Sequence, residues 1–387
     1  MIATLFRRHP LLGIHLVIIG LLLVGLVQRS GMDHLPQMAG YVAVLLSSYF
    51  LLDRIVAGWT VPDLRQDKVK LLAWAVLLLT CSIALAHWAF LGQVPLIAAM
   101  GEQDDLVVQS IRLHMTEDIP TWMAYASNIL IKALIPVTLV LCYKRFPRLF
   151  LALAIAGGIY AISLVQKSYI ITLFVPLWVA FLIAKRWWSF SLLTGGFVLI
   201  TALLLLVAQP EKLDRDAVAD DGKPKKGLVE DLVASVMRRV VLMPGWTVSA
   251  WFEYIPEQIP FQEGSAVRPL ALALGKPYHA LDREVYDIEY PVEAAKHTEG
   301  TMGSASFMYG WANFGLVGLL LSGVITAVVL RLITLLFAGD WRWAICVNVF
   351  PLLVLSSVAL TTVLLTHGWA VTLLLGTLFR PSEKLWR

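Results

Sequence analysis

Two adjacent arginines stand in the longest polar stretch of this sequence, within DLVASVMRRVVLMPGWTVSAWFEYIP (231–256). Arg238 and Arg239 carry guanidinium groups, whose planar donor pairs match the oxygens of a phosphate or diphosphate. On a helical wheel, Arg239 lies about 80° from an apolar valine face and Arg238 lies roughly opposite that face. We therefore predict an amphipathic helix, ended by Pro244 and Gly245, that either anchors to lipid phosphates or clamps a diphosphate.

Aromatic residues follow the arginines closely. Trp246, Trp251 and Tyr254 have amphipathic rings of the kind that lie at membrane interfaces or stack on sugars. They are candidate substrate-binding residues.

Three further cations are candidates for substrate binding. Lys132 falls near the middle of an apolar run, where an ammonium group needs a wet cavity or a partner, unless the helix starts later and the side chain snorkels outward. Lys167 separates two apolar runs and could be a simple turn residue. Arg112 lies in a shorter polar segment, where surface exposure is its default interpretation.

His297 and Glu299 precede the next apolar run, in KHTEGTMGSASFMYGWANFGLVGLL (296–320). A neutral imidazole, or a carboxylate with a raised pKa, could accept a proton from an attacking hydroxyl group there. A structural or incidental role for a loop histidine stays open.

The elements that must position these residues are membrane helices. The chain has 387 residues, of which 58% are hydrophobic and 15% charged, too apolar for one soluble core. The apolar runs are continuous, which favours helices over a barrel, and the first run has no cleavage site and predicts a retained signal anchor. We predict about ten transmembrane helices in an all-α polytopic protein, at 11–28, 38–56, 71–92, 123–143, 149–165, 168–184, 189–208, 309–337, 343–360 and 362–380.

Basic loops set the predicted orientation. The short Lys- and Arg-rich loops fall on one side if there are ten spans, which places both termini in the cytoplasm. One long span over 343–380 would instead put the C-terminus outside. The predicted segments are helices 1–7 with an outer loop at 93–122 (residues 1–208), a large outer loop with amphipathic helices (209–308), and helices 8–10 (309–387).

The large loop is acidic, with 11 Lys and Arg against 16 Asp and Glu, whereas the whole chain has a net charge of +4. An anion bound there must therefore be held by a local cluster of cations. The cysteines Cys81, Cys142 and Cys346 all lie in predicted spans, which argues against a disulfide framework in the loop. No zinc, Walker or dinucleotide pattern is present in the sequence.

Three segments resemble a known family. FLGQVPLIAAMGEQDD (90–105), VMRRVVLMPGWTVSAWFEYIP (236–256) and GSASFMYGWANFGLVGLLLSGVI (303–325) are similar, in this order, to segments of bacterial oligosaccharide repeat-unit polymerases, the Wzy-type O-antigen and capsule polymerases. One departure is Gln166-Lys167-Ser168, where many relatives have an arginine beside small residues. The resemblance implies a GT-C-like glycosyltransferase architecture.

The resemblance also implies a reaction. A polyprenyl-diphosphate-linked oligosaccharide would be polymerised at the periplasmic face of the bacterial inner membrane, in the company of membrane lipid, a chain-length regulator and a flippase. The leaving diphosphate calls for cations, which Arg239, Arg238, Lys132 or Lys167 would supply, and the acceptor hydroxyl calls for a base such as His297 or Glu299. The sequence shows no paired carboxylates for a metal, so we expect neither a metal nor a cofactor.

Two alternatives stay open at this point. An O-antigen ligase, which transfers the glycan to lipid A core, has a similar architecture. A membrane transporter could use Lys132 as a substrate or ion site, although the sequence lacks inverted repeats.

Overall fold

The computed structural model describes residues 7–59, 61–62, 64, 66–99, 118–208, 237–295, 300–337 and 339–386. All regular structure in these ranges is helical, which confirms the predicted all-α class. Five helical stretches are long and apolar enough to cross a membrane. They are α2 (Pro10–Ser30), α3 (Leu35–Ile55), α4 (Val69–Leu91), the continuous stretch Thr121–Cys142 formed by α7, η1 and α8, and α17 (Met308–Leu336).

Shorter apolar helices occupy the other predicted spans. The chain breaks between α9 and α10 at Gln166, as predicted, but the predicted break near Thr361 is wrong, because that residue lies inside α19. The breaks in this region instead follow α18, which contains Pro351, and precede α20 at Gly368. The bounds are α5 Pro95–Ala99, α9 Pro147–Ser163, α10 Lys167–Ile183, α11 Trp187–Ala208, α18 Trp341–Val354, α19 Leu360–Leu365, α20 Trp369–Leu378 and η4 Glu383–Leu385.

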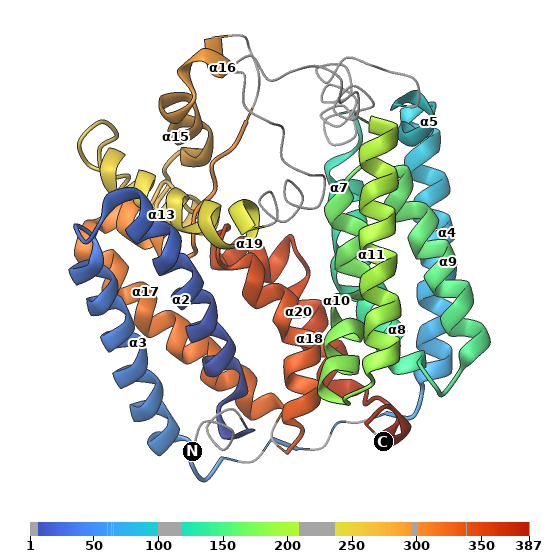
Figure 1. Ribbon diagram of the computed structural model, residues 1–387. Helices are drawn as coiled ribbons and strands as arrows, with labels where there is room; N and C mark the ends of the chain where they lie inside the picture. The colour runs from blue at the N-terminus through green and yellow to red at the C-terminus, as the bar shows by residue number, and fades with distance from the viewer. Residues whose placement is uncertain are drawn as a thin grey trace, which may run out of the picture. The chain divides into compact units, whose positions relative to one another are not determined.

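The helices form two compact units, each assembled from distant parts of the chain (Figure 1). Unit 1 contains residues 1–62, 226–338 and 351–364, and unit 2 contains residues 63–225, 339–350 and 365–387. This grouping cuts across the three segments expected from the sequence, because residues from the C-terminal segment pack into both units.

In unit 1, α3 and α2 pack against α17, and α13 (Met243–Tyr254) crosses α2 (Figure 1). The crossing uses Gly25 and Gly245, because a Cβ atom on either glycine would collide with backbone atoms of the facing helix. At the far end of α17, Arg331 forms a 2.9 Å ion pair with Asp53 of α3. Small residues at a helix crossing allow the close backbone approach that membrane helices favour.

Helix α17 contains a break that its sequence explains. Phe314 and Gly315 leave helical geometry, and Gly315 has a φ of 58°, which glycine adopts without strain. The carbonyl groups of Ala312 and Asn313 accept hydrogen bonds from the backbone of residues 262 and 263. The break at Asn-Phe-Gly therefore lies where two backbone hydrogen bonds hold the preceding loop against the helix.

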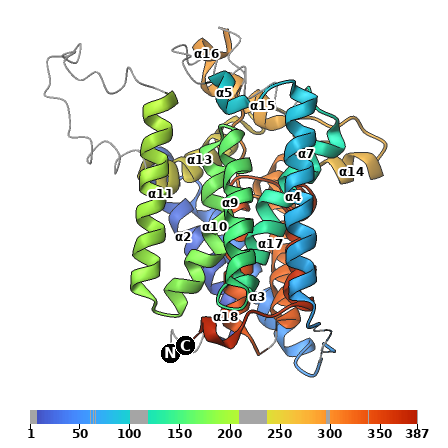
Figure 2. The ribbon, with the colours of Figure 1, turned by 90° about the vertical axis from the view of Figure 1, so that its right-hand side faces the viewer.

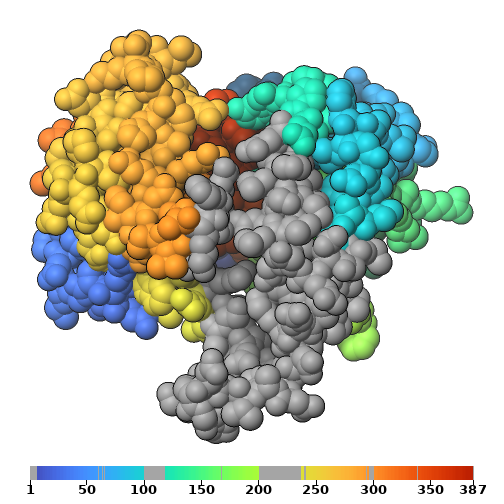
Figure 3. Space-filling view, turned by 90° about the horizontal axis from the view of Figure 1, so that it is seen from above, coloured from blue at the N-terminus to red at the C-terminus, as the bar shows by residue number. Residues whose placement is uncertain are grey.

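The loop before α17 folds into short helices: α14 (Arg268–Ala273), α15 (Leu281–Glu289) and α16 (Pro291–Ala295). Together with α13 they give the continuous yellow and orange surface in Figure 3. The described part of the large loop is thus a helical cap on unit 1.

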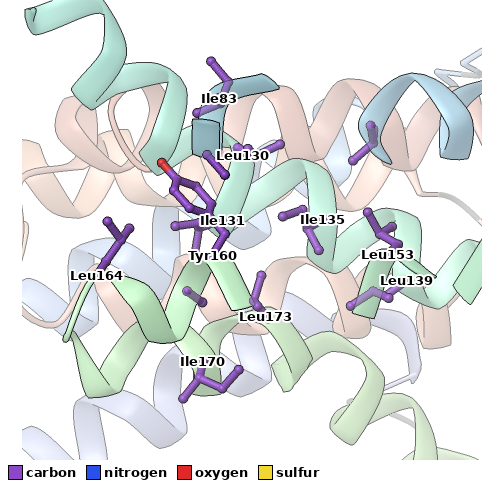
Figure 4. Packing of buried hydrophobic residues seen from close by; sticks show 13 residues of the cluster. Ile83, Leu130, Ile131, Ile135, Leu139, Leu153, Tyr160, Leu164, Ile170 and Leu173 are labelled. Atoms are coloured by element: carbon purple, nitrogen blue, oxygen red, sulfur yellow. The ribbon is translucent and has the colours of Figure 1, made fainter. Parts of the chain in front are cut away.

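In unit 2, α9 packs between α4 and α10, and α11 packs on α10 (Figure 2). The core of this unit is a cluster of aliphatic side chains from these helices and from the stretch 121–142 (Figure 4). The Tyr160 ring lies beside Ile131 within this cluster, so a polar hydroxyl group is carried deep into apolar surroundings.

The glycine crossing in unit 1 gives the first prediction. Gly25→Ala should force α2 and α13 apart and lower the free energy of unfolding by about 1–3 kcal/mol, as overpacking does. Gly20→Ala is the matched control, because no atom lies within 4 Å of its Cβ position, and it should be neutral or stabilising. Thermal unfolding of the purified variants in detergent measures both effects, and equal melting temperatures would refute the crossing.

Candidate functional site

Lys132 lies in a wide, π-helical turn, η1 (Leu130–Leu134), at the middle of the helical stretch Thr121–Cys142. The sequence accounts for this turn. Pro136 has no N–H group for the carbonyl of Lys132, and its ring would collide with that carbonyl in a regular α-helix. The Ile135 N–H bonds instead to Leu130, five residues back, which widens the turn.

The contacts of the Lys132 ammonium group are an imidazole and an aromatic ring. Its Nζ atom lies 3.0 Å from Nδ1 of His367 and 5.5 Å from the centroid of the Tyr169 ring. Among the described residues no carboxylate pairs with this ammonium group. A half-buried positive charge at the middle of a membrane-length helix thus has neutral partners only.

His367 reaches Lys132 because the chain breaks between α19 and α20. Gly368 adopts a φ of 73°, in the left-handed region, and ends that break. A Cβ atom there would lie 2.9 Å from the Cβ atom of Ala133, so only glycine lets the break approach this closely. The glycine therefore places His367 against the π-helical turn.

A small cavity of about 20 Å³ lies in the same unit and is lined in part by Tyr169, the ring that the Lys132 ammonium group faces. It has room for about one water molecule and is lined by polar groups, which suits a bound water or a small polar group. The polar lining residues come from three helices or their ends, α4, α7 (Thr121–Ile129) and α10: His87, Ser127, Asn128, Gln166 and Tyr169.

A hydrogen-bonded network borders this cavity. The Tyr160 hydroxyl group lies 2.8 Å from Nδ1 of His87 and 2.7 Å from Oγ of Ser127. All three side chains are buried. Such a chain of hydroxyl and imidazole groups can pass a proton between neighbours.

Most of this site was missed by the sequence prediction. Lys132 was singled out, but its partner His367 and the group of His87, Ser127 and Tyr160 were not. The available signal was an ionisable histidine inside or beside an apolar run, which is costly in a bilayer and usually functional. Tyr160 and Ser127 gave no such signal, since both residue types are common in apolar helices.

In unit 1, the prediction that Pro244 and Gly245 end the arginine helix is wrong. The chain passes from a second π-helical turn, η3 (Arg238–Leu242), directly into α13. Proline is tolerated because it stands in the first turn of α13, where the widened turn removes the clash that a regular helix would have. Met243 N–H bonds to Arg238, again five residues back.

Arg238 is exposed and stacks on a neighbouring ring. Its guanidinium carbon lies 5.5 Å from the centroid of the Trp246 ring. The indole Nε1 of Trp246 is buried and has no hydrogen-bond acceptor among the described residues. A stacked guanidinium group beside an unused N–H donor suits an anionic or sugar ligand.

The remaining predicted aromatics have partners within unit 1. Trp251 is fully buried and its Nε1 donates to the carbonyl of Met302 at 2.9 Å, so its ring is enclosed rather than offered to a sugar. Tyr254 donates a 2.7 Å hydrogen bond to Glu289. Both residues hold the cap together.

Arg29 ties α2 to two helices of this cap. It donates to Glu253 of α13, at 2.8 and 3.2 Å, and to Glu289 of α15, at 2.7 and 2.9 Å. Burial alone would raise the pKa of both carboxyl groups, but the hydrogen bonds from Arg29 hold each pKa below its ordinary range. Glu253 and Tyr254 of the Phe-Glu-Tyr sequence therefore belong to this clamp, whereas Phe252 packs against His34 and Trp311.

Other predicted site residues fall where the structure gives no side chain. His297, Glu299 and Arg112 lie outside the described residues. Lys167 is the first residue of α10, and Arg239 lies in η3, but their side chains are also outside the described set. Their roles stay predictions.

The Lys132 ammonium group can attract an anion, and the network of His87, Ser127 and Tyr160 in the same unit can relay a proton. No metal cluster is found among the described His, Cys, Asp and Glu residues. In comparisons with known proteins, no family model matches the chain, and neither a curated protein nor a solved structure is significantly similar to it.

The Arg29 clamp gives a prediction on pH. Because the carboxyl pKa values are lowered in the folded state, the clamp stabilises at neutral pH, and this stability is lost as the pH falls through the folded pKa values. The double variant Glu253→Gln, Glu289→Gln should have a lower melting temperature than the parent at neutral pH. Its melting temperature should also fall less than that of the parent when the pH is lowered. Thermal unfolding across the acid range tests this, with exposed Glu257→Gln as control. Parallel curves for the double variant and the parent would contradict it.

Proposed function

We propose that this membrane protein is a glycosyltransferase that polymerises lipid-linked oligosaccharide repeat units, with a polyprenyl-diphosphate-linked sugar chain as donor. The observation that carries the proposal is the Lys132 ammonium group, held at mid-helix against His367 and Tyr169. A half-buried cation without a carboxylate among its described contacts suits a ligand that brings the negative charge. A diphosphate leaving group brings that charge during the reaction.

The proposed chemistry is a substitution at the anomeric carbon. The hydroxyl group of the acceptor sugar forms the new C–O bond, the bond to the diphosphate breaks, and the diphosphate departs on its lipid with the bonding electrons. A base takes the hydroxyl proton, for which His297 or Glu299 is our candidate. Lys132 stabilises the negative charge that develops on the leaving group.

The two arginines have a related role in this proposal. Arg238, stacked on Trp246, and Arg239 in the same turn would hold phosphate oxygens of a lipid-linked substrate. Lys167 and Arg112 are further candidates for binding charged substrate groups, and Trp246 and Tyr254 for binding the sugars.

The setting belongs to the same proposal. Ten spans would place both termini in the cytoplasm and the cap of unit 1 in the periplasm, within the bacterial inner membrane. The growing chain would then be handled outside the cytoplasm, after a flippase has delivered the repeat unit and beside a chain-length regulator.

Lys132→Met tests the proposal, because it keeps a long apolar side chain and removes the charge. In proteoliposomes supplied with a lipid-linked repeat unit, polymer formation should fall about a hundredfold, the loss typical of removing one charge-stabilising donor. Lys70→Met, an exposed lysine in the first turn of α4, is the matched control and should polymerise normally.

Wild-type polymerisation by Lys132→Met, at a normal protein level, would contradict the role of this ammonium group. If the parent protein moved an anion across the vesicle and formed no polymer, the chain would be a transporter. Transfer of glycan to lipid A core without addition of repeats would identify a ligase.

A further inference from the structure

An apolar groove lies in unit 1, apart from the residues used in the proposed reaction. It has a volume of about 430 Å³ and runs between α14, α17 and the start of α19. Its walls are formed mainly by aliphatic and aromatic side chains, among them Val267, Leu270, Phe314, Leu321, Ile325 and Leu360.

Two polar side chains along the groove, Asn313 and Ser322, make internal hydrogen bonds. The Asn313 side chain accepts from the backbone N–H groups of Gly264, at 2.7 Å, and Ala266, at 3.2 Å, and donates to the Tyr309 carbonyl. Ser322 donates to the carbonyl of Gly318 at 2.9 Å. The lining is mainly apolar, so the groove suits a hydrocarbon occupant.

The groove opens along a helix that is long enough to cross a membrane. Leu321 and Ile325 line it while keeping 52% and 44% of their surface exposed. They lie one turn apart on α17, and Phe314 and Gly318, at and after the break in this helix, line the same groove. An exposed apolar stripe on a membrane-length helix faces lipid chains.

One wall of the groove, α14, has the features of a membrane-interface element. Leu272 is 83% exposed and Arg268 lies on the same short helix, whereas Lys276, just beyond it, forms a 2.8 Å ion pair with Glu263. Leucine enters the acyl region while the basic side chains stay with the headgroups. The Arg268 guanidinium group stacks 4.7 Å from the Tyr278 ring and pairs with no carboxylate among the described residues.

A second, open cavity of about 480 Å³ lies next to this basic end and is lined by Lys276, Tyr278 and His279. Ser265 lines this cavity, and Val267, two residues on, lines the groove. The chain segment 265–267 thus borders both the apolar groove and a cavity that has hydroxyl, imidazole and ammonium groups in its lining, as an acyl chain and its headgroup require.

We infer that the groove seats one acyl chain of an anionic membrane phospholipid, whose phosphate lies against Arg268. The guanidinium group of Arg268 and the apolar stripe match the charged and the apolar ends of such a lipid. This inference uses the membrane placement of α17 and does not depend on the proposed enzymatic activity.

Photo-crosslinking tests the inference. The full chain is placed in nanodiscs that contain phosphatidylglycerol with a diazirine on one acyl chain, and labelled residues are mapped by mass spectrometry. We expect labels to concentrate on the groove residues of α14, α17 and α19. Ala273→Trp, which fills the groove from α14, should reduce this labelling about tenfold, equivalent to about 1.4 kcal/mol of binding free energy.

Two controls separate the groove from general lipid contact. Ala89→Trp places the same side chain on an exposed position of α4 and should leave groove labelling unchanged. Arg268→Gln should reduce labelling by phosphatidylglycerol more than labelling by phosphatidylcholine. Labels spread evenly over the exposed faces, or undiminished in folded Ala273→Trp, would overturn the inference. So would labelling by a prenyl phosphate probe in place of the phospholipid.

Discussion

A positive charge inside an apolar helix must find partners, and this constraint shapes the part of unit 2 around Lys132. Transfer of an unpaired ammonium group to the bilayer centre costs roughly 3 kcal/mol or more. Unit 2 meets that requirement with the imidazole of His367 and the ring of Tyr169 rather than with a described carboxylate. A neutral setting leaves the charge free to attract a ligand, which a permanent ion pair would prevent.

The same backbone feature, a π-helical turn shortly before a proline, occurs at Lys132 and at Arg238. In each, a π-helical turn is followed by one residue and then a proline: Leu130–Leu134 precedes Pro136, and Arg238–Leu242 precedes Pro244. Proline removes an N–H group and crowds the carbonyl four residues back, so the turn widens and its carbonyls lose regular partners. Lys132 and Arg238 therefore lie on irregular backbone, which is common at functional sites.

In unit 1, unlike around Lys132, a partly buried cation is paired with carboxylates. Arg29 serves two carboxylates at once, and Ser249 and Tyr254 complete the hydrogen bonding of Glu253 and Glu289. These bonds join the end of α2 to the cap, while Gly25 and Gly245 bring α2 and α13 into contact. Arg238 is exposed and can bind a ligand. It is the basic residue of η3 and α13 whose side chain the structure describes.

Helix positions were largely predictable from the sequence, because runs of apolar residues carry the signal for a membrane helix. The prediction failed where backbone chemistry acts locally. Pro244 was expected to end a helix, but a widened turn absorbs it, and Thr361 was expected at a break that lies elsewhere. The clamp of Arg29 and the pairing of Lys132 with His367 join residues 224 to 260 positions apart, which no local pattern reveals.

The central claim is that the Lys132 ammonium group binds the diphosphate of a lipid-linked substrate. Cryo-electron microscopy of the chain in nanodiscs, with a non-hydrolysable prenyl diphosphate analogue, tests it most directly. We predict phosphate density within hydrogen-bond distance of Lys132 Nζ, beside His367 and Tyr169. Phosphate density elsewhere, with Lys132 still bound only to His367, would contradict it.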